Sequence, residues 1–229
     1  AFAARGLRPS LRDAFEASVF HLDLLPADLA LDGALVVDLG ANVGRFTEAV
    51  LRVAPRARVI AVEPAPGPRR ALERRFGGDA RVEIVGKAVG AARGTATLHI
   101  TGHDNNSSLR VPRRESGEIH ADGDWEVVER LDVELVTLDD LLAGRRADVV
   151  KIDVQGAEVD VLRGGERALR DVRAILLEVT FVSHYEDDAT FPELNAEMER
   201  RGFRLHGLSA PIRHPNGEAL WADACYTRA

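Results

Sequence analysis

The sequence is poor in cysteine and has no long hydrophobic run. Cys225 is the single cysteine, so the chain can form no internal disulfide and carries no Cys-x-x-Cys metal or redox motif. The most apolar stretch near its start, residues 17–31, is interrupted by His21, Asp23 and Asp28, which makes it too short and too charged to span a membrane. We therefore expect a protein of the reducing cytoplasm without a membrane segment.

Excess positive charge is also lacking. The formal net charge is −7, and the arginine pairs are scattered among acidic residues rather than gathered in one tract. This balance argues against nucleic acid or an anionic membrane as the main partner. We expect the partner to be a small molecule, and self-association stays open.

What the sequence does contain is the composition of one globular domain: 229 residues, 45% hydrophobic and 29% charged. Apolar runs typical of buried strands alternate with helical segments, which predicts an α/β fold with a doubly wound, mostly parallel sheet. Strands are expected at 34–39, 58–63, 82–89 (with an irregularity around Gly86), 94–100, 131–136, 148–153, 174–179, 203–208 and 220–227. Helices are expected at 43–53, 66–76, from Thr137, at 157–169 with a break at 164–165, and at 191–201.

Two segments stand apart from this alternation. Residues 1–32 are expected to form an N-terminal helical segment ahead of a Rossmann-like domain at 33–229. Residues 101–130 are polar and aperiodic, and a loop of that length inside a compact domain is uncommon unless it has a function. The ligands of a doubly wound fold bind beyond the carboxyl ends of its strands.

The turn after the first expected strand indicates the kind of ligand. It reads Asp-Leu-Gly-Ala-Asn-Val-Gly over residues 38–44, and Gly40 and Gly44 allow a sharp turn with the backbone close to a ligand. Glu63 ends the second strand about 20 residues later, where a carboxylate accepts hydrogen bonds from ribose hydroxyls. Together they predict a ligand that contains adenosine.

The departures from the dinucleotide fingerprint indicate which ligand it is. Asn42 replaces the middle glycine of the Gly-x-Gly-x-x-Gly pattern, and Asp38 places an acid two residues before the first glycine. A carboxylate there would repel a pyrophosphate, whereas S-adenosylmethionine (SAM) carries an ammonium, a sulfonium and no phosphate. The charge therefore favours SAM over NAD.

Five motifs occur in an order that resembles the FkbM family of SAM-dependent methyltransferases. They are Val-Asp-Leu-Gly-Ala-Asn-Val-Gly at 37–44, Val-Ile-Ala-Val-Glu-Pro at 59–64, Asn-Ser-Ser-Leu at 106–109, Thr-Leu-Asp-Asp-Leu at 137–141, and Val-Lys-Ile-Asp-Val-Gln-Gly-Ala-Glu at 150–158. The last is followed by Val-Leu-Arg-Gly at 161–164. The resemblance covers residues 36–179 and departs at Gln155, where the family commonly has Glu. An amide there could still cap or orient the next helix.

The resemblance implies a class I methyltransferase fold, with a seven-stranded sheet whose last strand is antiparallel. It also implies O-methylation, often of sugar or secondary-metabolite hydroxyls. It assigns cofactor contacts to Asp38, Gly40, Asn42, Gly44 and Glu63, and by analogy of fold the adenine would lie beside Ala88 and Val89.

Methyl transfer to an alcohol needs alignment of donor and acceptor and a base or metal to assist the hydroxyl. Asp153, which ends a buried strand, is the first candidate, either as base or as ligand of a divalent cation such as Mg²⁺. Glu178 stands inside an apolar strand, where a charge is costly unless paired or functional. His184 has a pKa suited to proton transfer. For Glu158, a helix-stabilising role or pairing with Lys151 is as plausible as catalysis.

The acceptor side is indicated by Asn106 and Ser107, whose polar groups suit a hydroxylated acceptor. His103 and Asp104 in the same loop are weaker candidates. Two other functions stay open at this stage: an NAD-dependent oxidoreductase or epimerase, and a catalytically silent methyltransferase-like binding subunit. The broken glycine pattern and the lack of a Tyr-x-x-x-Lys pair count against the first, and intact Asp38, Glu63 and Asp153 against the second.

Overall fold

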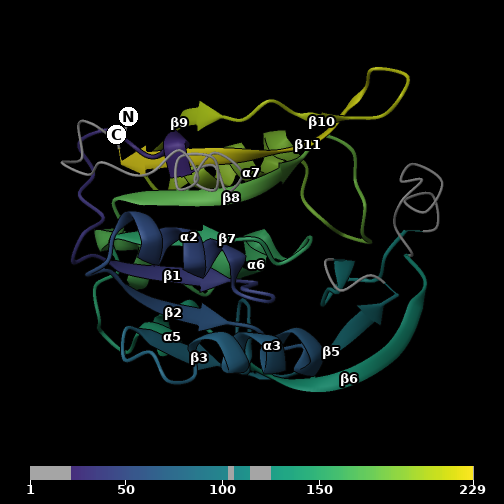
Figure 1. Ribbon diagram of the computed structural model, residues 1–229. Helices are drawn as coiled ribbons and strands as arrows, with labels where there is room; N and C mark the ends of the chain where they lie inside the picture. The colour runs from purple at the N-terminus through teal and green to yellow at the C-terminus, as the bar shows by residue number, and fades with distance from the viewer. Residues whose placement is uncertain (1–21, 103–105, 114–124, 229) are drawn as a thin grey trace.

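The computed structural model describes residues 22–102, 106–113 and 125–228, which build two β-sheets with helices packed around the larger one (Figure 1). The larger sheet contains β1 (Leu35–Leu39), β2 (Arg58–Val62), β3 (Val82–Val85), β7 (Val149–Ile152), β8 (Ala174–Thr180), β9 (Phe203–Leu208), β10 (Ile212–Arg213) and β11 (Ala219–Arg228). The α-helices are α2 (Arg45–Val53), α3 (Pro66–Phe76), α5 (Leu138–Leu142), α6 (Glu158–Arg163) and α7 (Phe191–Arg200).

The order of the strands confirms the predicted fold class. β3, β2, β1, β7 and β8 lie side by side and run parallel, and β11 pairs antiparallel with β8. β9 and the two-residue β10 both pair antiparallel with β11. The expected seven strands with an antiparallel last strand are therefore present, and β10 adds an eighth strand to the described sheet.

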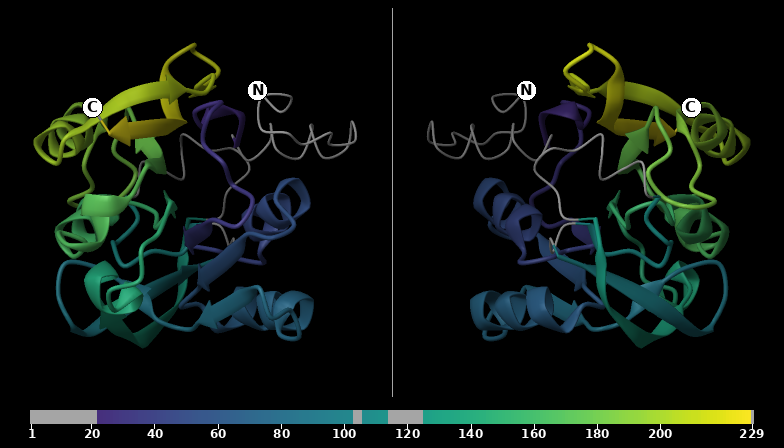
Figure 2. Two further views of the ribbon diagram at one scale, coloured as in Figure 1. Left: turned by 90° about the vertical axis from the view of Figure 1, so that its left-hand side faces the viewer. Right: turned by 90° about the vertical axis from the view of Figure 1, so that its right-hand side faces the viewer.

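The sheet is buried on both faces because its central strands are apolar throughout. All five residues of β1 are buried, as expected for a parallel strand covered by helices on both sides. Val36 packs in one core with Phe46 of α2 and Leu72 of α3. Val37 packs in the other core with residues of α5, α6 and α7. The two helical layers lie on opposite sides of the sheet in the views of Figure 2.

Two predicted strands at the smaller sheet had wrong bounds, and the predicted helix 157–169 ends early, because α6 stops at Arg163 and a separate 3-10 helix follows at Ala168–Asp171. The expected third strand at 82–89 is split: β3 ends at Val85, and β4 (Ala88–Val89) pairs with β6 (Val127–Val136) of the smaller sheet. β6 begins at Val127, four residues before the expected start at Leu131 and within the polar stretch 101–130. The expected strand 94–100 is present as β5 (Gly94–Thr101), which pairs with β6. Alternating burial along β6 shows a half-exposed strand, which leaves no continuous apolar run to mark its start.

The N-terminal prediction can be compared only from Leu22 onward, since residues 1–21 lie outside the described part. Leu22–Leu24 form one 3-10 turn rather than a continued helix. Leu25, Leu29 and Leu31 are buried in the same core as β1. In the described residues no helix is long and apolar enough to cross a membrane.

Candidate functional site

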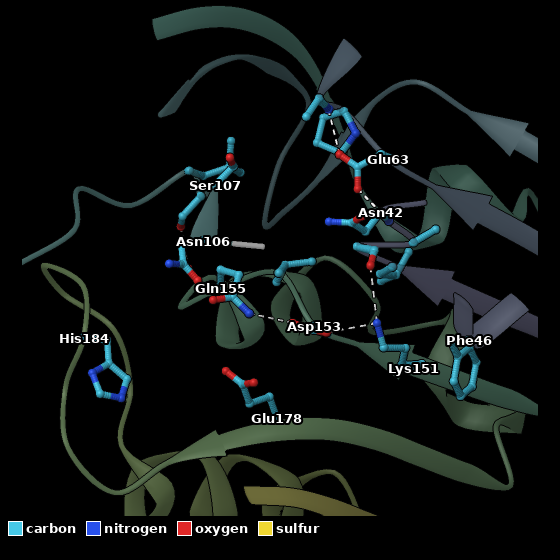
Figure 3. Close-up of a pocket in the computed structure, with 18 of the residues that line it drawn as sticks. Asn42, Phe46, Glu63, Asn106, Ser107, Lys151, Asp153, Gln155, Glu178 and His184 are labelled. Carbon is cyan, nitrogen blue, oxygen red and sulfur yellow. Dashed lines mark hydrogen bonds and ion pairs between the residues drawn. The ribbon is translucent and has the colours of Figure 1, made fainter. Parts of the chain in front are cut away.

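A cavity of about 1180 Å³ opens at the carboxyl ends of β1, β2, β7 and β8, where the turns of these parallel strands meet (Figure 3). Most of the predicted site residues line it: Gly40, Asn42, Glu63, Ala88, Val89, Asn106, Ser107, Asp153, Glu178 and His184. Asp38 and Gly44 lie outside its wall. The structure thus brings residues from distant parts of the sequence to one cavity, while their individual roles stay predictions.

The glycines of the first turn are required by the packing of the chain itself. Gly40 has φ +74°, and a Cβ added there would lie 1.8 Å from the backbone oxygen of Asp153. Gly44 has φ +83°, and its Cβ would meet Leu72 and Phe76 of α3 at 2.5 and 2.6 Å. Only glycine allows the turns after β1 and β7 to lie this close together.

Glu63 is held at the end of β2 by backbone donors. Its Oε2 accepts a hydrogen bond of 2.8 Å from the Asn42 amide, and its Oε1 one of 2.8 Å from the Ala65 amide. The residue is only 7% exposed. Burial raises the pKa of Glu63 to about 7, although the two amide donors act to lower it. The carboxylate therefore has a fixed orientation toward the cavity, and it titrates near neutral pH.

Asp38 lies one layer behind the cavity. It is fully buried, its Oδ2 accepts from the Thr47 hydroxyl at 2.7 Å, and its Oδ1 lies 3.5 Å from Lys151 Nζ. Lys151 also lies 3.1 Å from Asp153 Oδ2 and donates to the Gly40 carbonyl at 3.3 Å. Burial disfavours the charged lysine, but the two carboxylates raise the pKa of Lys151 overall. Asp38 is therefore linked to the cavity wall by Lys151.

Lys151 was not predicted as a site residue, yet it lines the cavity and links the turns after β1 and β7. The suggested pairing of Glu158 with Lys151 was wrong, because Lys151 pairs with Asp38 and Asp153. Glu158 Oε1 instead accepts from the amides of Val154 and Gly156, both at 3.2 Å. Burial raises the pKa of Glu158 to about 7.

Gln155 does not cap the following helix, which corrects the expectation for this position. The N-cap of α6 is Ala157, without a side-chain cap. The Gln155 side chain instead turns back, and its Nε2 donates to Asp153 Oδ1 at 2.8 Å (Figure 3). Its Oε1 accepts from the Tyr185 hydroxyl at 2.9 Å.

Glu178 and Asp223 form a pair of carboxyl groups across strands β8 and β11. Glu178 is directly opposite Asp223 in the antiparallel register, and both residues line the cavity. Burial, followed by the negative charges of Asp153, Asp223 and Glu158, raises the pKa of Glu178 well above its usual value. This carboxyl group therefore holds its proton much more strongly than an exposed glutamate does.

His184 is 3% exposed and lies close to two indole rings. Its ring centroid is 5.8 Å from that of Trp125 and 5.9 Å from that of Trp221, the latter edge-on. Neither tryptophan was predicted, and both line the cavity. Asn106 and Ser107 line the same cavity, while His103 and Asp104 fall outside the described residues.

In the part of the chain that the structure describes, no group of three or more His, Cys, Asp and Glu side chains is arranged to hold a metal ion. Asp153 therefore has no set of co-ligands there. Its close partners are a lysine and an amide, and a carboxylate held in this way can accept hydrogen bonds or a proton.

Comparison with known proteins gives one consistent family. The family described as "Methyltransferase FkbM domain" matches residues 38–205. Methyltransferase sdnD of Sordaria araneosa is 31% identical over 196 residues, covering 74% of this chain and 73% of that protein. The 2-O-methyltransferase NoeI of Sinorhizobium fredii is 28% identical over 165 residues, covering 66% and 65%.

Among solved structures, an FkbM methyltransferase from Methylobacillus flagellatus KT superposes with a TM-score of 0.58 at 19% identity. The match covers 96% of this chain and 48% of that one, so the chain spans about half the length of that solved structure. At this identity the likeness concerns the fold, and it agrees with the strand order found above.

Proposed function

Since the chain belongs to the FkbM family of methyltransferases, we propose that it transfers a methyl group from SAM to a hydroxyl oxygen of a sugar or secondary-metabolite acceptor. The observation that carries this proposal is that one cavity contains both ends of the site. It joins Glu63 at the end of β2 to Asp153 and Glu178 at the ends of β7 and β8. One end therefore suits a nucleoside, and the other suits a hydroxyl that must lose a proton.

The residues at the nucleoside end fit SAM. A carboxylate offers about four lone-pair sites, and two backbone amides occupy one site on each oxygen of Glu63. The remaining sites can accept from the two ribose hydroxyls. Ala88 and Val89, both buried, offer an apolar surface for the adenine. When bound, SAM would supply the electrophilic methyl group for an in-line displacement.

The chain's own residues would align the acceptor and take up its proton. Asp153 is held from both sides, by Lys151 and by Gln155, which fixes its carboxylate toward the cavity and makes it our first choice as base. Glu178 is the alternative base, because a carboxylate of raised pKa binds a proton more strongly. His184 lies further along the same wall, among aromatic rings.

The acceptor end suits a ring that carries hydroxyl groups. Trp125 and Trp221 give flat apolar surfaces there, and Asn106 and Ser107 add polar groups to the wall of the same cavity. Aromatic faces beside hydrogen-bonding groups match the mixed surface of a sugar or a polyol. The printed name of NoeI, a 2-O-methyltransferase, is in keeping with hydroxyl methylation.

The first test is calorimetric titration with S-adenosylhomocysteine (SAH), with NAD as the control ligand. Micromolar binding of SAH alone supports the cofactor, and hydroxylated acceptors are then screened with SAM, with and without Mg²⁺. Preference for NAD would overturn the proposal in favour of an oxidoreductase. SAH binding without methylation of any acceptor would favour a silent binding subunit.

A further inference from the structure

Gln155 occupies a backbone conformation that few residues adopt. Its φ is +56°, in the left-handed region, and the neighbouring Gly156 has φ +93°. Such conformations cost free energy and persist where surrounding contacts hold them. Here the contacts come from Asp153 on one side and from Tyr185 and Ser108 on the other. The turn after β7 therefore places an amide side chain where it meets two other segments.

On one side, the Gln155 side chain contacts the Asp153 carboxylate. An ionised carboxylate only accepts hydrogen bonds, so the Gln155 amide must present Nε2 to it, and the distance to Oδ1 is 2.8 Å. Lys151 holds the other oxygen, Oδ2, at 3.1 Å. The two oxygens of Asp153 thus have separate partners, and this limits rotation of the carboxylate about its own axis.

The second segment is the 106–109 loop, which contributes Asn106 and Ser107 to the cavity wall. With Nε2 committed to Asp153, Gln155 Oε1 accepts from the Tyr185 hydroxyl at 2.9 Å, and the single proton of this hydroxyl is shared with the Asn106 carbonyl oxygen at 3.1 Å. The Ser108 hydroxyl donates to the Gln155 backbone carbonyl. Tyr185 is 2% exposed, so water competes little for these bonds.

We propose that Gln155 is a positioning residue that couples Asp153 to the 106–109 loop through Tyr185, so that the base and the acceptor-binding wall keep one relative geometry. The inference rests on the proposed role of Asp153. Gln155 and Tyr185 act through other groups, and neither has to touch the reacting atoms. An amide is suited to this position because one group provides a donor for Asp153 and an acceptor for Tyr185.

The decisive variant is Gln155→Glu, which introduces the residue that the family commonly has here, keeps the shape of the side chain and changes its proton count. In its protonated form the introduced carboxyl group can donate to Asp153 as the amide does. In its ionised form it would face a second carboxylate at about the same distance, which strongly disfavours double ionisation. We expect turnover within about threefold of wild type at pH 6 and a further loss of about tenfold relative to wild type by pH 8.

A readout without any acceptor tests the same contact. The urea midpoint of Gln155→Glu should fall relative to wild type as pH rises from 6 to 8, because the introduced carboxyl group ionises freely in the unfolded chain and not in the native one. A pH-independent difference in both turnover and urea midpoint would overturn the proposal. If wild type binds SAH but methylates nothing, the proposed function fails, and the urea measurement still decides this inference.

Tyr185→Phe tests the other half of the coupling. Loss of one neutral hydrogen bond predicts an acceptor KM raised about 3- to 10-fold, with SAH affinity within twofold of wild type. The control is Tyr226→Phe, whose hydroxyl donates to Asn195 at 3.1 Å outside the cavity wall, and which should leave KM unchanged. Equal effects of the two variants on KM, or weakened SAH binding in Tyr185→Phe alone, would contradict the coupling.

Discussion

At the scale of single residues, Glu63 should make cofactor affinity depend on pH. Burial raises the pKa of Glu63 to about 7, and ribose hydroxyls donate to its ionised form. Affinity for SAH should therefore rise as pH increases from 6 to 8 and level off above. Glu63→Gln should lower affinity about 10- to 100-fold, as expected for hydrogen bonds to a charged group, and should reduce this pH dependence. Calorimetry across pH measures both effects.

Glu158→Gln is the matched control for that experiment. Glu158 also has a pKa raised to about 7 by burial and also accepts from two backbone amides, but it lies outside the cavity wall. This variant should keep the pH dependence of SAH affinity. If it removes that dependence as Glu63→Gln does, the titrating group is not the one at the end of β2.

Asp153 is expected to separate chemistry from cofactor binding. Asp153→Ala should reduce turnover by about 10²- to 10⁴-fold, the usual contribution of a positioned general base, while SAH affinity stays nearly unchanged. Turnover and calorimetry on one preparation measure the two quantities. Comparable loss of both would place Asp153 at the cofactor end of the cavity.

Glu178→Gln gives the comparison that identifies the base. If Glu178 takes the proton, Glu178→Gln should lower turnover more than Asp153→Ala does, and the pH profile should lose the rise in turnover that accompanies ionisation of Glu178. If Asp153 takes the proton, Glu178→Gln should lower turnover less than Asp153→Ala does. The neutral amide preserves the shape of the side chain opposite Asp223.

The residues that sequence reasoning found and missed differ in a physical way. Glu63 and Asp153 end apolar strands, and such ends meet at one edge of a parallel sheet, so their shared cavity could be predicted. Lys151 carried a usable signal, since a charge inside the apolar strand 149–152 requires a partner. Tyr185, Trp125 and Trp221 carried none, because their contacts depend on how loops distant in sequence fold together.

At the scale of elements, the close approach of two strand-ending turns should make glycine necessary at position 40. Gly40→Ala adds a Cβ that would lie 1.8 Å from a backbone oxygen of the turn after β7. Gly33→Ala is the matched control, because Gly33 also has a positive φ of +87° but has open space around its Cβ position. Gly40→Ala should lower the free energy of unfolding by at least about 2 kcal/mol more than Gly33→Ala does, because only the substitution at Gly40 pushes two backbone segments apart.

Urea denaturation of the two variants measures the difference. Equal costs would mean that the conformation alone, and not the contact with the turn after β7, requires glycine at position 40. A larger cost for Gly40→Ala together with weakened SAH binding would show that the same contact shapes the cavity.

The elements that could be predicted were those with a continuous apolar run or a clear boundary signal in the sequence. The expected helix 66–76 has the bounds of α3, and the expected N-cap Thr137 accepts from the Asp140 amide at the start of α5. The smaller sheet was only partly predicted. In β5 and β6, buried and exposed residues are mixed, so no continuous hydrophobic run marks the start of β6. β4 is only two residues long, which is too short to give a pattern.

At the scale of the whole molecule, the sheet order explains why one cavity serves both ends of the reaction. β1 is central, with β2 on one side and β7 and β8 on the other. The turn that carries Gly40 and Asn42 therefore lies between Glu63 and Asp153. A ligand that contacts both ends bridges strands whose separation is set by two buried cores, so its binding should stabilise the entire fold.

Cys225 offers a direct measurement of that stabilisation. It is the single thiol, it is 0% exposed, and it lies in β11 between β8 and β9, so a thiol reagent should reach it only when the sheet opens. SAH at 100 times its Kd should add about 2.7 kcal/mol, which for a chain of this size corresponds to a rise in Tm of about 5–10 °C. Bound SAH should also slow the labelling of Cys225 by the factor that corresponds to this gain in free energy of unfolding.

The comparison ligands and variants make this a test of the site as well as of stability. NAD at the same concentration should change neither Tm nor the labelling rate, and Glu63→Gln should reduce the SAH effect to the extent that it weakens binding. A Tm rise without slower labelling would mean that β11 opens separately from the cofactor half of the sheet. Equal protection by NAD would contradict SAM as the cofactor, because it would show that the cavity accepts a pyrophosphate beside Lys151 and Asp153 as readily as it accepts SAH.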